Sequence, residues 1–298
     1  MFCSSQAHSI WGRLPPLPYP QSRARLILHT FSLVLALATA TVTAGPAAGS
    51  RVDILSAEIN SNPEEQQLYL RRALAWADSG QNDKAMADVN HAEQLGDPLQ
   101  ATLVRGILWF RQDQLEPART CFDAFLDRYP DHPGALGYRA RLLRSSGDNA
   151  GALADYQQLI ALQPAQDPGI YLATAQLLAA EPDLQIPEAL ALLDRRITEV
   201  GAIPQLQRYA IRLEKQRGNY SAALRRLSTL DDSIRATPQW HVETAELLLL
   251  SGHPAQAQSH LLVATEQLQN LRPTPARAVT REKAATLLEQ ANNLPIQK

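Results

Sequence analysis

The stretch RARLLRSSGDNAGALADYQQLIALQP, residues 139–164, decides the fold. It predicts two short helices joined by a turn at residues 146–148, because apolar residues recur at helical spacing on either side of that turn. Neither helix can bury its apolar stripe alone, so the pair must pack against neighbouring helices. The residues that share a face are Ala140 and Leu143 in the first helix and Ala152, Tyr156 and Leu159 in the second.

The same pattern returns along the chain at a nearly constant interval. Each copy has an alanine, here called the reference alanine, that follows a turn and lies in the second helix. The reference alanines are Ala85, Ala118, Ala152, Ala189, Ala223 and Ala257, separated by 33, 34, 37, 34 and 34 residues. Such a period over six copies is typical of stacked helical repeats. The fourth copy carries an insertion, EPDLQIP, at 181–187.

A second repeated position lies twelve residues before each reference alanine. We expect it to lie where the two helices of a copy cross, and small residues there would allow close approach. Its occupants are Ala73, Gly106, Ala140, Leu177, Ile211 and Ala245.

The period, the order of small, aromatic, glycine and alanine positions, and the closing Pro130 and Pro164 resemble tetratricopeptide repeats (TPRs). The resemblance covers residues 66–272. It implies an all-α, right-handed superhelical solenoid of antiparallel helix pairs, with about six TPR-like repeats.

The ends of the repeat domain are expected to carry capping helices. Residues 45–65 predict an N-terminal cap with Val52, Leu55 and Ile59 facing inward. Residues 273–298 predict a C-terminal capping helix and tail, whose apolar stripe would contain Val279, Ala284, Leu287 and Leu288.

Residues 1–44 have the pattern of a secretory signal peptide. Arginines precede the apolar stretch 26–42, and small residues at 42–44 suit cleavage. We therefore expect an exported protein, periplasmic or extracellular. The alternative is an inner-membrane anchor formed by an uncleaved 26–42, although its 17 residues are at the short limit for a membrane span.

Charge and cysteine content exclude some functions. The chain has 28 basic and 30 acidic residues, a net charge of −2. Removal of 1–44 takes three arginines and no acids, leaving 25 basic and 30 acidic residues, a net charge of −5. We therefore expect no nucleic-acid partner. Cys121 is then the one remaining cysteine, which rules out an internal disulfide.

A row of arginines occupies the position thirteen residues before the reference alanine in the first three copies. Arg72 and Arg139 are each matched by an aspartate three residues after that alanine, Asp88 and Asp155, whereas Arg105 is matched by Cys121. One interpretation is an anion-binding row. The other is a set of ion pairs that join the two helices of a repeat.

The repeat register also predicts which residues of the first helices line a ligand-binding groove. An apolar floor and a set of cations would suit an extended acidic or carboxylate-ended peptide. The alternative interpretation is a solvated face of cationic side chains. The predicted ligand-binding residues are Leu70, Leu74, Leu103, Ile107, Phe110, Arg111, Arg141, Arg144, Arg208, Arg212 and Lys215.

We find no catalytic motif, metal-binding motif or cofactor-binding motif. Nucleophile elbows, Walker loops and dinucleotide-binding glycine patterns are missing from the sequence. The histidines His91, His132, His241, His253 and His260 show only one weak metal signal, the seven-residue step from His253 to His260, so a structural role is favoured.

These observations predict a non-catalytic protein–protein interaction scaffold of the bacterial cell envelope, which holds an extended peptide or partner segment in its groove. The alternative is an envelope-assembly or secretion accessory factor that acts on polysaccharide or peptidoglycan machinery. A membrane contact is expected only if the signal segment is uncleaved. The partner's identity, the pathway and the oligomeric state do not follow from the sequence.

Overall fold

The computed structural model describes residues 48–180, 185–201 and 203–294, and within them it contains fifteen helices and no strand. The signal-like segment 1–44 lies outside the described residues. The chain divides into two compact units, Met1–Leu162 and Gln163–Lys298. The boundary falls inside the predicted repeat domain 66–272.

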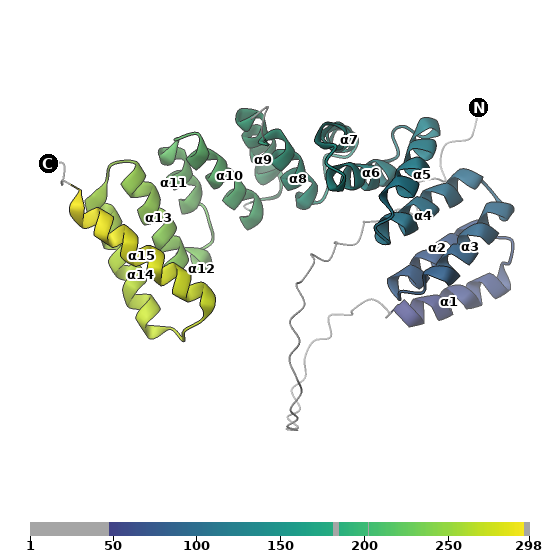
Figure 1. The fold of residues 1–298 in the computed structure, drawn as a ribbon, viewed down its shortest axis with the longest axis horizontal. Coiled ribbons are helices and arrows are strands. Elements are labelled where there is room, and N and C mark those ends of the chain that lie inside the picture. Colours follow the sequence, from purple (N-terminus) through teal and green to yellow (C-terminus); the bar gives the residue numbers. More distant parts are fainter. Residues whose placement is uncertain (1–47, 181–184, 202, 295–298) are drawn as a thin grey trace, which may run out of the picture. The chain divides into compact units, whose positions relative to one another are not determined.

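The first unit contains a single helix followed by three helix pairs (Figure 1). Within each pair, α2 packs on α3, α4 on α5 and α6 on α7. The first helices of neighbouring pairs also contact each other, α2 with α4 and α4 with α6. The bounds are α1 Ala48–Ser61, α2 Gln66–Asp78, α3 Asn82–Leu95, α4 Pro98–Arg111, α5 Leu115–Arg128, α6 Pro133–Ser145 and α7 Asn149–Leu162.

The second unit repeats this arrangement. α8 packs on α9, α10 on α11 and α13 on α14, and the last helix, α15, lies against both α13 and α14. The bounds are α8 Pro168–Leu178, α9 Ile186–Val200, α10 Pro204–Gln216, α11 Tyr220–Ser228, α12 Asp232–Arg235, α13 Pro238–Leu250, α14 Pro254–Asn270 and α15 Pro275–Asn293. Both units are therefore all-α solenoids of helix pairs, as predicted.

The reference alanines mark the helix crossings. All six are fully buried, and so are Ala73, Ala140 and Ala245 at the position twelve residues earlier. At Gly106 the approach is closest, since an added Cβ would lie 2.9 Å from Cβ of Cys121 and 2.9 Å from Cε1 of Phe122.

The predicted register is wrong in the first helices of the fourth and fifth copies. Leu177 and Ile211 are only partly buried, whereas Ala175 and Ala210 are fully buried. In the fourth copy the inserted residues lengthen the connection to the second helix, so a fixed count of twelve from Ala189 falls too far along α8.

In five of the six copies the turn has a residue with positive φ, five positions before the reference alanine; the corresponding residue of the fourth copy lies outside the described residues. Glycine occupies this position in four copies, with φ between 76° at Gly218 and 85° at Gly147. In the second copy Asp113 adopts a φ of 61° instead. Aspartate is one of the few other residues that tolerate this region.

Helix starts follow a cap-and-proline pattern. The Thr237 and Thr274 hydroxyls accept hydrogen bonds from the backbone N–H of Trp240 and Arg277, both at 3.3 Å, directly before Pro238 and Pro275. Each threonine caps its helix, and the proline that follows suits the first helical position. Asp97, His132 and Asp167 cap α4, α6 and α8 in the same way, each directly before a proline.

The first and last described helices pack on the helix pairs next to them, α1 on α2 and α15 on α13 and α14. Val52, Leu55 and Ile59 of α1 are buried in the core of the first unit. In α15, Ala284 and Leu287 are buried, but Val279 is 66% exposed and does not belong to the packed stripe. Ala291 completes the buried stripe instead. Across the described residues, no helix has the length and apolar character needed to cross a membrane.

Candidate functional site

The arginine row forms ion pairs that join the two helices of a repeat. Arg72 donates from Nε and Nη2 to the two oxygens of Asp88, both at 2.7 Å. Arg139 makes the same fork to Asp155, with both distances 2.8 Å. Hydrogen bonding to these aspartates raises the pKa of both arginines despite their partial burial. Such two-pronged pairs are geometrically specific and strong, so the ion-pair interpretation describes both residues.

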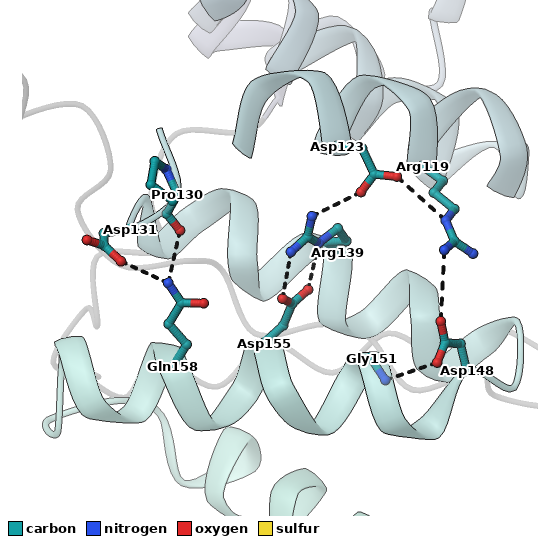
Figure 2. Close-up of polar contacts among 9 residues, drawn as sticks. All are labelled: Arg119, Asp123, Pro130, Asp131, Arg139, Asp148, Gly151, Asp155 and Gln158. Atoms are coloured by element: carbon teal, nitrogen blue, oxygen red, sulfur yellow. Dashed lines mark hydrogen bonds and ion pairs between the residues drawn. The ribbon is translucent and has the colours of Figure 1, made fainter. Parts of the chain in front are cut away.

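Each of these arginines also reaches the preceding second helix. Arg139 donates from Nη1 to Asp123 of α5 at 3.0 Å, and Arg72 donates to the hydroxyl of Ser56 of α1 at 3.2 Å. Figure 2 shows Arg139 between Asp123 and Asp155. The arginines therefore bind consecutive repeats together as well as the two helices of their own repeat.

Asp123 continues this network along α5. Arg119 lies 3.6 Å from Asp123 and 3.9 Å from Asp148, at the start of α7 (Figure 2). The Asp148 carboxylate also accepts a hydrogen bond from the Gly151 backbone N–H at 2.9 Å. The ion-pair chain, defined here as Asp148, Arg119, Asp123, Arg139 and Asp155 in order of contact, thus links α5, α6 and α7.

Arg105 differs because Cys121 replaces the aspartate of its own second helix. It donates to Glu93 at 2.8 Å and to Asn90 at 3.1 Å, both on the preceding helix α3. Burial raises the pKa of the Cys121 thiol, and the positive charge of Arg105 partly opposes this rise. Arg105 therefore keeps the contact between repeats and lacks the contact within its repeat.

Most of the predicted apolar floor lies inside the packed core. Leu70, Leu103 and Ile107 are buried, the latter two almost completely. Leu74 and Phe110 are partly exposed. Of the apolar residues proposed to contact a ligand, only these last two reach the surface of the first unit.

Three of the predicted ligand-binding cations are bound to acids of a neighbouring repeat. Arg111 of α4 contacts Asp78 at the end of α2 at 2.8 Å. In the second unit, Arg208 lies 3.5 Å from Glu243, and Lys215 lies 2.6 Å from Glu246. These contacts compete with any anionic ligand.

Glu246 is held by two lysines. Lys283 of α15 lies 3.0 Å from its second carboxylate oxygen. Burial alone would raise the pKa of Glu246, but hydrogen bonds from Lys215 and Lys283 outweigh burial and lower it. A signal for this pair existed in the sequence, because Glu246 occupies the same repeat position as Arg212 and Arg141, eleven residues before the reference alanine.

Arg141 and Arg144, at the end of α6, have aromatic neighbours. The Arg141 guanidinium lies 5.4 Å from the ring centroid of Tyr138, which also packs edge-on against Phe110 at 6.2 Å. Burial raises the pKa of the Tyr156 hydroxyl, and the charges of Arg141 and Arg144 oppose that rise. We call Phe110, Tyr138, Arg141, Arg144 and Tyr156 the α6 cluster.

Arg212 occupies the repeat position of Arg141 and has a similar surrounding. It is exposed, and its guanidinium lies 5.7 Å from the ring centroid of Tyr209. Among the described ion pairs, none involves Arg141 or Arg212. Neither Tyr138 nor Tyr209 was among the predicted site residues, although each lies three residues before its arginine, a spacing at which helical side chains contact each other.

The histidines mostly serve packing and capping. His91 packs edge-on against Tyr69 at 4.5 Å, and His132 caps α6 by accepting from the Ala135 backbone N–H at 3.1 Å. His241 and His260, which are far apart in sequence, are brought together on α13 and α14. The described residues contain no group of three or more His, Cys, Asp or Glu side chains arranged to hold a metal.

Comparisons with known proteins identify the type of fold. No family model and no curated protein matches the chain. Among solved structures, a tetratricopeptide repeat protein from Parabacteroides merdae is 20% identical, with a TM-score of 0.52 over 78% of this chain and 94% of that one. MamA protein is 12% identical, with a TM-score of 0.52 over 60% of this chain and all of that one.

A third similar structure is Naa15/Naa10 bound to HypK-THB, 16% identical, with a TM-score of 0.50. The match covers 82% of this chain and 36% of that chain. At these identities the similarity concerns the fold alone. The described helices and these comparisons show that the chain has a TPR-like fold, an α-solenoid of helix pairs.

Proposed function

We propose that this protein is a non-catalytic protein–protein interaction scaffold that binds an extended partner segment on its first helices. The fold supports this proposal, because stacked helix pairs present long surfaces to partners. One similar structure is a protein complex, Naa15/Naa10 bound to HypK-THB. The signal-like segment 1–44 supports export to the bacterial cell envelope as part of the same proposal.

The α6 cluster is the observation that best supports a binding site. Arg111, Arg208 and Lys215 already contact carboxylates, whereas Arg141 lies on an aromatic ring. Arg141 also interacts with the Tyr156 hydroxyl. The Tyr138 ring orients its guanidinium, and the remaining donors can form a carboxylate fork. We therefore expect a partner segment with an acidic residue or a terminal carboxylate, next to an apolar residue that contacts Phe110.

A charge reversal with a matched control tests this site. The double variant R141E/R144E should lose binding of the partner captured from envelope extract by the full chain. The control is R128E, because Arg128 is exposed on the second helix α5 and also lies 5.4 Å from a tyrosine centroid, that of Tyr129. Circular dichroism should show equal helix content in all three proteins.

The salt dependence gives a second readout. Exposed charges are screened over about 8 Å at physiological ionic strength, so binding through Arg141 and Arg144 should weaken as salt rises. Partner binding that is equal for R141E/R144E and R128E would refute the assignment of the α6 cluster. Loss of binding in R141E/R144E alone supports it.

A further inference from the structure

Two histidine rings meet between the helices of the last repeat. His241 lies on α13 and His260 on α14, and their Nδ1 atoms are 3.0 Å apart. The ring centroids are 5.3 Å apart and the ring planes are inclined by 40°. Two ring nitrogens from two different helices are therefore held within hydrogen-bond distance of each other.

Neighbouring groups fix both rings. Trp240 packs edge-on against His241 at 5.2 Å and against His260 at 5.6 Å. Its indole N–H donates to the Leu227 carbonyl of α11 at 3.0 Å, so the tryptophan is itself anchored. Ligands held in place in this way bind a metal without first being ordered.

The distance between the nitrogens matches a two-histidine chelate. With metal–nitrogen bonds of about 2.0–2.1 Å, a 3.0 Å separation corresponds to an N–metal–N angle of about 94°. Adjacent ligands of tetragonal Cu²⁺ are about 90° apart, whereas a tetrahedral Zn²⁺ site would need the nitrogens about 3.3 Å apart. Both histidines are only partly buried, which leaves room for water as the remaining ligands.

We propose that His241 and His260 chelate a Cu²⁺ ion through their Nδ1 atoms, with water at the other positions. Imidazole nitrogens suit Cu²⁺, and Cu²⁺ binds such ligands more tightly than Zn²⁺ or Ni²⁺. Two protein ligands make a site that exchanges its metal readily, in line with the lack of a third nearby ligand in the described part of the chain.

The local electrostatics favour the neutral form of both imidazole rings. Burial lowers the pKa of His241, and the charge of His260 lowers it further. Burial also lowers the pKa of His260. Neutral imidazole is the form that binds metal, so less proton competition is expected near neutral pH than for two exposed histidines. The competing arrangement is a direct N–H···N hydrogen bond between the rings.

Cu²⁺ titration of the full chain tests the proposal. Wild type should bind Cu²⁺ with two-nitrogen coupling in its electron paramagnetic resonance spectrum. His241→Gln and His260→Gln, each alone, should weaken this binding by at least about tenfold, because outer-shell changes already cost 10–100-fold. His253→Gln is the control, since His253 lies on the same repeat and its Nδ1 faces the Ser251 hydroxyl at 3.2 Å.

A thermal measurement separates loss of a ligand from loss of the fold. Cu²⁺ should raise the melting temperature of wild type and of His253→Gln, each relative to its own metal-free value, and leave both site variants unshifted. Equal Cu²⁺ affinity in wild type and either site variant would overturn the proposal. A spectrum with one coupled nitrogen would also overturn it, because the rings would then be joined only by their hydrogen bond.

Discussion

Removal of Asp155 should destabilise the first unit by about 2–3 kcal/mol. Breaking a buried ion pair by deleting one partner usually costs about 3–5 kcal/mol, because the remaining charge loses its counter-ion. The Asp155 side chain is only 6% exposed, but that of Arg139 is 24% exposed and keeps Asp123 at 3.0 Å. Because Arg139 keeps one counter-ion and some contact with water, we expect Asp155→Ala to cost no more than the lower end of this range, about 2–3 kcal/mol.

Substitutions at other members of the ion-pair chain should destabilise the unit by more or by less than Asp155→Ala, depending on burial. Arg139→Met leaves the buried Asp155 carboxylate without its cation, so we expect about 3–5 kcal/mol. Asp123→Ala should cost less than about 1 kcal/mol, since its side chain is 44% exposed and water screens its contact with Arg139.

Urea unfolding followed by circular dichroism measures these costs from the shift in midpoint at constant slope. A double-mutant cycle between Arg139 and Asp155 should give a coupling energy clearly larger than that between Arg139 and Asp123. Equal coupling energies, or a cost of Arg139→Met below that of Asp123→Ala, would refute the reasoning from burial.

Three further changes test other parts of the structure. Cys121→Asp should stabilise the second repeat by about 1 kcal/mol through a new pair with Arg105; unchanged urea midpoints would contradict this. Gly106→Ala should destabilise by about 1–3 kcal/mol, because its Cβ would collide with Phe122 and the gain in helix propensity is smaller; a raised midpoint would disprove the close crossing. Burial lowers the pKa of the His132 cap, so the unfolded chain takes up the proton first and stability should fall as pH drops below about 6.5. His132→Asn keeps a capping side chain that does not titrate, and its urea midpoint should fall less between pH 7.5 and pH 5; an identical fall would contradict the cap.

The helix pairs could be predicted because the buried alanines and the turn glycines recur in the sequence at a nearly constant interval. A fixed count from the reference alanine holds only where the turn has constant length, so Leu177 was chosen in the fourth copy although Ala175 is the fully buried residue. The insertion at 181–187 could be seen in the sequence, but which helix absorbed it could not.

The surface residues of the candidate site were harder to predict. The repeat register predicts on which helix and on which face Leu103 and Ile107 lie. It does not predict that neighbouring first helices pack together and bury both residues. Register also could not show that Glu246 of one repeat binds Lys215 of the preceding one. Such contacts depend on the spacing between helices, which the sequence of a single repeat does not specify.

One contact between repeats persists while its partners change. The residue five positions after the reference alanine accepts from an arginine of the following repeat: Asn90 from Arg105 at 3.1 Å and Asp123 from Arg139 at 3.0 Å. In the second unit, Asp194 at this position accepts from Arg226 at 2.8 Å.

Arg226 belongs to a second helix, whereas Arg105 and Arg139 belong to first helices. What recurs is therefore a polar acceptor on one second helix and an arginine in the next repeat, whichever helix carries it. In a solenoid, stability depends on the interface between adjacent repeats. This recurring contact explains why the arginines contribute to stability rather than to a row of anion-binding sites. In the α6 cluster, by contrast, two arginines of one first helix lie beside aromatic side chains.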